Sequence, residues 1–240
     1  MFYKAYHDKI IYKTVEDTNL PKSFHGFTIF FISDIHRRKI RAKTIHDIKQ
    51  KIDAVVIGGD LLEKGVPLNR VKKNIRLLKE WNSPIYFVWG NNDYEVNNEQ
   101  LIQLFDDEHV IILADSIAVI NRKNENILFL CLDWTTEKRD SVAINIHSDK
   151  YNILVSHAPH SYFYLNKEIK DKINLVLAGH THGGQIRFFG IGPYRRGSFK
   201  KVEDTYVLIS EGYGFSVLPF RLGTNAECHV LKLQNVMFNI

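Results

Sequence analysis

The sequence predicts an α/β fold in which mixed β-sheets form a sandwich flanked by helices. Two observations lead to this prediction. Up to about residue 107, apolar strand-like runs alternate with helix-like stretches. Beyond residue 110, apolar runs follow one another with little helix between them. Alternating units favour parallel strands and consecutive strands favour antiparallel ones, so the pattern indicates mixed sheets rather than one doubly wound sheet.

The first half supplies three buried strands and three helices. Dense apolar runs predict the strands at residues 27–32, 54–57 and 84–89. Apolar residues at helical spacing, such as Val71, Ile75 and Leu78, predict a helix over 67–81, with Pro67 in its first turn. Two further helices are expected at residues 43–52 and 97–107.

The second half is dominated by strands. Apolar and β-branched runs predict strands within residues 110–120, 126–132, 151–155, 175–178, 206–209 and 229–233. One helix is expected at 161–171. The 240 residues are enough for one large core, and we find no repeat or linker, so a single domain over 1–240 is expected.

Composition places the chain among ordinary globular proteins. The net charge of +5 is mildly basic and would attract phosphate groups, although a small excess is also common on plain solvated surfaces. Cys131 and Cys228 lie far apart in apolar runs, which predicts buried, reduced thiols. The first residues lack an apolar segment and no run of 18 apolar residues occurs, so we expect a cytoplasmic protein.

Polar side chains follow five of the predicted strands. Because the carboxyl ends of parallel strands meet at one edge of a sheet, these side chains are expected to converge. They combine carboxylates, imidazoles and one amide without a thiolate, which favours Mn, Fe, Zn or Co over a structural zinc. The candidate ligands are Asp34, His36, Asp60, Asn91, His157, His180 and His182.

Each candidate ligand also has an ordinary structural interpretation. Asp34 and Asp60 could cap helices, Asn91 could occupy a left-handed turn, and His157 could be a core histidine. Their shared position after apolar strands favours the metal site. Asp60, after two glycines, is the expected bridge between two cations.

At these positions the chain resembles the calcineurin-like metallophosphoesterase superfamily. The resemblance is carried by Ser33-Asp34-Ile35-His36, Gly58-Gly59-Asp60, Gly90-Asn91-Asn92-Asp93, Ser156-His157-Ala158-Pro159 and the block from Gly179 to Gln185. It implies a four-layer αββα sandwich of two mixed sheets. It also implies that Asp34, His36, Asp60 and His182 hold one metal, and that Asp60, Asn91, His157 and His180 hold the other.

A closer resemblance links the chain to a bacterial branch of membrane-associated phosphodiesterases. Its motifs lie outside the ligands, at residues 20–27, 183–187, 194–197, 212–214 and 218–223. Members of that branch often begin with a membrane helix or an export signal, which the first residues here do not resemble. Peripheral contact with the inner face of a membrane is a further expectation.

Asn92 departs from the pattern of the superfamily, which commonly has histidine there. That histidine is thought to protonate the leaving oxygen, and an amide cannot supply a proton near neutral pH. The departure suggests either a poor catalyst or an enzyme specialised for diesters, and we favour the diesterase. His160 is a candidate substitute acid, although a surface role suits it better.

The resemblance implies a hydrolytic mechanism with two divalent cations, manganese being favoured. A hydroxide that bridges the cations would attack phosphorus, and Asp60, Asn92 and His182 are the expected catalytic residues. Arg187, Tyr194 and Arg196 follow the last ligand block and are candidate substrate-binding residues. Surface or packing roles suit all three equally well.

The leading prediction is a phosphodiesterase acting on small or lipid-linked substrates. A nuclease is a second reading, but the sequence shows no long basic groove with interleaved aromatics, so nucleic acid is not an expected partner. A non-catalytic metal-binding scaffold with the same fold is a third. The basic run at 37–41 and the apolar stretch at 214–220 could contact headgroups and acyl chains, or could be ordinary surface and core.

Overall fold

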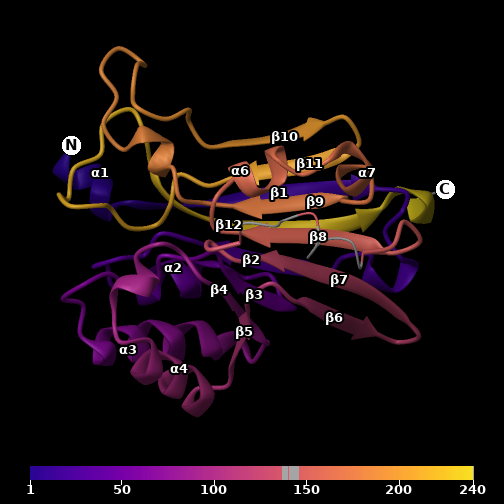
Figure 1. The fold of residues 1–240 in the computed structure, drawn as a ribbon, viewed down its shortest axis with the longest axis horizontal. Helices are drawn as coiled ribbons and strands as arrows, with labels where there is room; N and C mark the ends of the chain where they lie inside the picture. The colour runs from indigo at the N-terminus through magenta and orange to yellow at the C-terminus, as the bar shows by residue number, and fades with distance from the viewer. Residues whose placement is uncertain (137–139, 141–145, 240) are drawn as a thin grey trace.

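Two six-stranded mixed sheets form the centre of the molecule (Figure 1). The computed structural model describes residues 1–136, 140 and 146–239. The first sheet has the order β1-β12-β2-β3-β4-β5. Its strands are β1 (Asp8–Asp17), β12 (Ala226–Asn235), β2 (Thr28–Ile32), β3 (Ala54–Ile57), β4 (Ile85–Val88) and β5 (Val110–Leu113).

The second sheet has the order β10-β11-β9-β8-β7-β6. Its strands are β10 (Ser198–Val202), β11 (Thr205–Ile209), β9 (Leu175–Ala178), β8 (Tyr151–Ser156), β7 (Glu125–Leu132) and β6 (Ile117–Arg122). Each sheet contains four adjacent parallel strands: β2 to β5 in the first, and β7, β8, β9 and β11 in the second. Antiparallel pairs β12·β2, β10·β11 and β6·β7 make both sheets mixed.

Helices cover the outer faces of the two sheets and complete four layers. The α-helices are α1 (Phe2–Tyr6), α2 (Ala42–Asp47), α3 (Leu68–Leu78), α4 (Asn98–Asp107), α6 (His160–Phe163) and α7 (Lys167–Lys170). Short 3-10 turns lie at Lys22–Phe24, Lys79–Trp81, Asp93–Glu95, His182–Gly184 and Val236–Asn239. Figure 1 shows α2, α3 and α4 together beside the first sheet.

Alternation of side chains along β2 explains the layering. Phe30 and Ile32 pack in a core with residues of α3 and α4, whereas Ile29 and Phe31 pack in a second core between the sheets. Successive side chains of a strand point to opposite faces, so one fully apolar strand serves both cores. A third core, which includes Tyr162 and residues of β7, β8 and β9, lies between the second sheet and the α6–α7 segment. The predicted four-layer sandwich is therefore confirmed.

The structure refines several predicted elements. The segment expected to be one helix at 161–171 forms the two short helices α6 and α7, and the helix expected at 43–52 ends at Asp47. Strands β1 and β10 were not predicted. β1 lies at a sheet edge and buries fully only Val15, so its sequence lacks an apolar run. Both cysteines are buried free thiols, as predicted.

A buried ion pair ties the start of β1 to the loop after β2. The Asp8 carboxylate contacts the Arg38 guanidinium and accepts hydrogen bonds from the hydroxyls of Thr44 and Tyr213. Burial alone raises the pKa of Asp8, but Arg38 and the two hydroxyls outweigh that effect, and the pKa lies below its ordinary value. Arg38, although part of the basic run, is thus buried and paired.

Replacing Asp8 with Asn leaves the Arg38 charge buried without a counter-ion. We expect the free energy of unfolding at pH 7 to fall by about 3–5 kcal/mol. Because the pKa of Asp8 is lowered, the ion pair stabilises the fold above the ordinary carboxyl pKa, and this contribution is lost as pH falls through the native value. The difference between the two proteins should therefore shrink at a pH well below the ordinary value of 3.8. Urea unfolding at both pH values measures it.

The matched control is Asp47→Asn, which removes an exposed partner of Lys43. Exposed pairs of this kind contribute less than about 1 kcal/mol. Equal losses in the two variants would contradict the role assigned to Asp8.

Candidate metal centre

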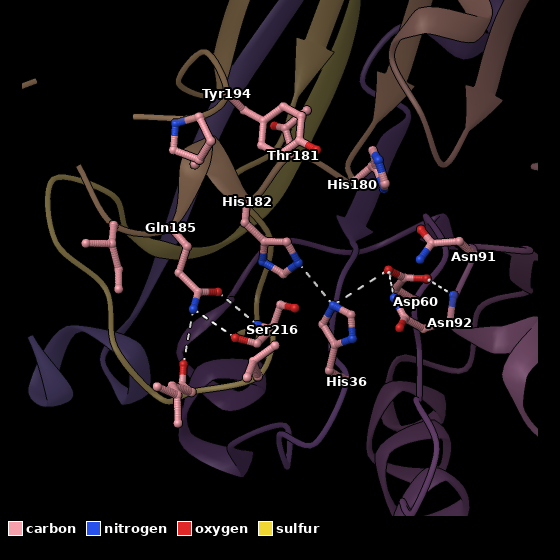
Figure 2. A pocket seen from close by; sticks show the side chains of 15 residues that line it. His36, Asp60, Asn91, Asn92, His180, Thr181, His182, Gln185, Tyr194 and Ser216 are labelled. Atoms are coloured by element: carbon pink, nitrogen blue, oxygen red, sulfur yellow. Dashed lines mark hydrogen bonds and ion pairs between the residues drawn. The ribbon is translucent and has the colours of Figure 1, made fainter. Parts of the chain in front are cut away.

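All seven predicted ligands lie in loops at the carboxyl ends of strands. Asp34 and His36 follow β2, Asp60 follows β3 and Asn91 follows β4, all in the first sheet. His157 follows β8, and His180 with His182 follows β9, in the second sheet. The site is therefore assembled between the two sheets (Figure 2).

One group of candidate ligands comprises Asp34, His36 and His182. Nε2 of His182 lies 3.4 Å from Oδ1 of Asp34, and 3.0 Å from Nε2 of His36. Figure 2 shows the two imidazole rings facing each other. All three side chains are buried, and one donor atom from each lies within 4.8 Å of the others. This spacing fits a single cation.

A second group comprises Asp60, His157 and His180. Nε2 of His157 lies 3.3 Å from Oδ2 of Asp60, and Nδ1 of His180 lies 3.2 Å from Nε2 of His157. The donor atoms of this group also fall within 4.8 Å of one another. Oδ2 of Asp60 is 3.7 Å from Nε2 of His36, so the same carboxylate adjoins both groups.

Asn91 and Asn92 sit beside the second group with different hydrogen bonding. The Oδ1 atom of Asn91 is buried and has no hydrogen-bond partner among the residues that the structure describes. An orphaned buried acceptor is costly, and a cation would satisfy it. Asn92, in contrast, donates from its backbone N–H to Oδ1 of Asp60 at 2.9 Å and from Nδ2 to Oδ2 at 2.7 Å.

Left-handed backbone conformations recur at the candidate ligands. The φ angles are +54° at Asp34, +50° at His36, +52° at Asp60, +71° at His180 and +49° at His182. Residues other than glycine rarely adopt such angles, and each instance costs on the order of 1–3 kcal/mol. Strain concentrated at these positions indicates that the loops are shaped for the site.

Two glycines allow the loops to approach closely. A Cβ atom at Gly90 would lie 2.2 Å from Oδ1 of Asp60, and one at Gly179 would lie 2.5 Å from Oδ2 of Asp34. Neither neighbour is a free side-chain end, since both carboxylates are held in the site. The glycines are therefore required for contact between loops of different strands.

Burial and mutual charge shift the pKa values of the site. Burial raises the pKa of Asp34. Burial acts in the same direction on Asp60, but His157 outweighs it and holds the Asp60 pKa well below its usual range. Burial and the neighbouring His157 lower the pKa of His180 to about 4. The pKa of His157 is raised to about 9, because Asp60 and Asp34 overcome the opposing effect of burial.

Asp93 links the loops after β3 and β4. Its carboxylate accepts hydrogen bonds from the backbone N–H groups of Asp60 (2.7 Å), Leu62 (3.2 Å) and Gly90 (2.8 Å). Burial, reinforced by Asp60, raises its pKa to about 7. The sequence gives no sign of this role, because hydrogen bonds to a distant loop leave no local pattern.

Glu63 and Arg221 contact the imidazoles of two candidate ligands on the ring nitrogen that faces away from the site. The sequence analysis did not predict a role for either residue. Oε2 of Glu63 lies 3.1 Å from Nδ1 of His36. Arg221 is fully buried, with Nη2 3.3 Å from Nδ1 of His182 and hydrogen-bonded to the carbonyl oxygens of Glu211 and Gly214. Partners of this type orient ligand rings. Arg221 lies within the motif at residues 218–223, which is the one feature of the sequence that points to it.

Trp134 packs over the second group. Its ring centroid lies 4.8 Å from that of His180 and 5.8 Å from that of His157. Trp134 comes two residues after the end of β7, which is parallel to β8. Trp134 is thus a strand-end residue like the candidate ligands, but an indole does not bind metal, so a pattern of ligand residues does not reveal it.

The three candidate substrate residues occupy different places. Tyr194 lines the pocket over the site, with its ring centroid 6.4 Å from that of His180. Arg187 donates hydrogen bonds to the carbonyl oxygens of Gly183 and Gly190 within its own loop. Nε of Arg196 is 2.9 Å from Oε1 of the buried Glu211. Of these, only Tyr194 lies along the pocket.

The pocket that opens from the site has a volume of about 440 Å³. Its polar wall contains His36, Asp60, Asn92, His180 and His182. Its other wall is more apolar and comes from two loops. That wall consists of Ile186, Pro193, Tyr194, Val217 and Leu218.

Comparison with known proteins identifies the class. The family model described as calcineurin-like phosphoesterase matches residues 27–184, which include all seven candidate ligands. The chain belongs to this family of metal-dependent phosphoester hydrolases. The uncharacterized Bacillus subtilis protein YpbG is 40% identical over 210 residues, covering 86% of this chain and 80% of its own. An uncharacterized metallophosphoesterase of Helicobacter pylori is 26% identical and covers 97% of this chain and 67% of its own.

Solved structures support the fold. The sulfate thiohydrolase SoxB of Thermus thermophilus aligns with a TM-score of 0.56 at 11% identity, over 92% of this chain and 58% of its own. Phosphopantetheinyl hydrolase from Mycobacterium tuberculosis aligns with a TM-score of 0.50 at 12% identity, over 79% of this chain and 91% of its own. At such identities the likeness concerns the fold alone.

Asp60→Ala should remove the carboxylate that adjoins both ligand groups. We expect the affinity for manganese to fall at least about 100-fold, because even residues that only support the ligands affect metal affinity about 10–100-fold. Calorimetry on metal-stripped protein measures this affinity. Asp171→Ala, an exposed carboxylate paired with Lys167, is the control and should leave binding unchanged. Wild-type affinity in the Asp60 variant would rule out the shared site.

Proposed function

We propose that this protein is a two-metal phosphodiester hydrolase. The observation that carries the proposal is the pair of ligand groups joined by Asp60 at the base of one pocket. The donors suit the ions: they are nitrogen and oxygen atoms, one of them the orphaned Oδ1 of Asn91, and the groups contain no thiolate. Manganese is the proposed physiological metal.

Divalent cations held by these residues would activate water and neutralise charge on a phosphoryl group. Asp34, His36 and His182 would hold one cation, and Asp60, Asn91, His157 and His180 the other, with Asp60 common to both. The backbone N–H of His180 donates to Asp34 at 3.0 Å, and that of Asn92 donates to Asp60. These bonds fix the oxygen atoms that would face the cations.

Asn92 supports a preference for diesters or acidic leaving groups. It lines the pocket and donates to Asp60, but an amide has no proton to give to a departing alkoxide near pH 7. Asp60, Asn92 and His182 remain the proposed catalytic residues.

A substrate screen tests the proposed reaction. With manganese, the protein should hydrolyse bis-p-nitrophenyl phosphate faster than p-nitrophenyl phosphate, and a chelator should abolish both activities. Single-stranded DNA in the same assay distinguishes a nuclease. If the protein binds metal but hydrolyses none of these three substrates, it is a metal-binding scaffold and the proposal is wrong.

Asn92→His should restore a general acid. General-acid help is typically worth about 100- to 10,000-fold. We therefore expect kcat/KM for a diester with an alkyl leaving group to rise by about 10-fold or more, while the value for bis-p-nitrophenyl phosphate changes little. Asn92→Gln, which retains the amide, is the control. An equal change for both substrates would mean that Asn92 does not limit proton transfer.

A further inference from the structure

Exposed apolar side chains gather around the mouth of the metal-site pocket. Of the seventeen large apolar side chains exposed in the described part of the chain, ten lie in three short segments near residues 1–6, 188–194 and 217–218. We call this set the apolar rim. Its members are Met1, Phe2, Tyr3, Tyr6, Phe188, Phe189, Ile191, Tyr194, Val217 and Leu218.

The segments of the rim contact one another. The backbone N–H of Arg221 donates to the carbonyl oxygen of Met1 at 3.3 Å, and the rings of Phe2 and Phe220 are 6.4 Å apart. Nε2 of Gln185 donates to the carbonyl oxygen of Leu218 at 3.1 Å. Figure 1 shows α1 and the loops after β9 and β11 at the same end of the molecule. The three segments of the rim therefore lie at one end of the molecule, and two of them, through Tyr194, Val217 and Leu218, line the same pocket.

Two loop tips of the rim hold bulky apolar residues in strained conformations. Phe189 has a φ of +48° and a fully exposed side chain, and Val217 has a φ of +61° with 81% of its side chain exposed. For β-branched or bulky residues such angles are outliers. Neither strain nor exposed apolar surface favours folding, so both point to a role in contact with something outside the chain.

The surface around the rim is strongly basic. Residues 1–7, 35–46, 186–197 and 214–223 together contain ten lysines and arginines and no aspartate or glutamate. Arg38 and Arg221 are buried, and Arg37 and Arg196 pair with Glu63 and Glu211. Lys39 and Arg195 are exposed. Arg41 is also exposed, although it lies 3.5 Å from the Asp8 carboxylate. A second pocket of about 820 Å³, lined by Phe2, Tyr6, Arg37, Lys39, Arg41 and Phe215 among others, adjoins the rim.

From this arrangement we propose that the apolar rim docks on an anionic lipid bilayer. Aromatic and aliphatic side chains would enter the interface between headgroups and acyl chains, while the surrounding lysines and arginines meet lipid phosphates. Protruding tips such as Phe189 suit a fluid layer better than a rigid protein surface, which would require a matching socket. Within the described residues no helix is long and apolar enough to cross a bilayer, so the contact would be peripheral.

Docking would place the mouth of the pocket at the level of lipid headgroups. Tyr194, Val217 and Leu218 belong both to the rim and to the pocket wall. If the proposed function holds, the substrate class is then a phosphodiester carried by a lipid. This consequence rests on the proposed function, whereas docking itself does not.

Vesicle sedimentation tests the docking with metal-free protein, so that its outcome is independent of catalysis. Wild-type protein should bind vesicles of phosphatidylglycerol and phosphatidylcholine, and should bind vesicles of pure phosphatidylcholine much less. Binding should weaken at about 1 M salt, where charges are screened beyond about 3 Å. Equal binding to both vesicles, or to neither, would overturn the proposal.

The decisive test is a triple variant, called the rim variant, with the substitutions Phe188→Ser, Phe189→Ser and Ile191→Ser. It changes exposed side chains outside the pocket wall. We expect its partition into anionic vesicles to fall about tenfold or more. The control, the triple variant Ile102→Ser, Val119→Ser, Tyr164→Ser, removes three exposed apolar groups elsewhere on the surface and should bind as wild type. A double variant with the substitutions Lys39→Glu and Arg195→Glu should bind anionic vesicles more weakly than wild type.

Sedimentation velocity separates lipid docking from self-association. Wild-type protein and the rim variant should show the same mass across concentrations. A wild-type oligomer that the rim variant abolishes, together with unchanged vesicle binding, would instead assign the rim to a contact between copies of the chain. If the rim variant still hydrolyses a soluble diester, it is folded. Its loss of vesicle binding then does not come from unfolding.

Discussion

Burial of carboxylates beside imidazoles, between two sheets, is the constraint on which the rest of this structure depends. Asp34, Asp60 and Asp93 are withdrawn from water, which is costly for unpaired charges. Each receives a backbone hydrogen bond from a loop of another strand: His180 donates to Asp34, Asn92 to Asp60, and Asp60 to Asp93. The same bonds that make burial tolerable also fix the donor atoms around the site.

The layered architecture is what brings these loops together. The parallel strands β2, β3 and β4 end at one edge of the first sheet, and β8 and β9 end at the facing edge of the second. Each sheet by itself supplies only part of either ligand group, since Asp34 and His36 need His182, and Asp60 needs His157 and His180. The core between the sheets therefore holds the site as well as the fold, and left-handed backbone at five ligands is tolerated because this packing over-determines it.

The pocket combines the candidate metal ligands with an amide and an apolar mouth. Asn92 stands where the resemblance to the superfamily leads us to expect a histidine, and its amide holds Asp60. Arg221 fixes the loop that carries Phe215, Val217 and Leu218, because its guanidinium bonds Gly214 and Glu211 while reaching His182. A ligand-supporting residue and the apolar mouth are thus parts of one loop, which couples the chemistry of the site to the surface that surrounds it.

The sequence alone determined the sheet-rich sandwich, the positions of most strands and the seven candidate ligands. It did so because buried strands are continuous apolar runs and because ligands follow them directly. Tertiary structure alone decided what depends on contacts between distant segments. Edge strand β1 is held by pairing with β12 rather than by an apolar run. Asp93, Glu63 and Arg221 act on residues in other loops, and the placement of Arg38 depends on Asp8. The rim forms because two loops and the first helix meet at one end. Such features have no local period or motif, so only the folded chain displays them.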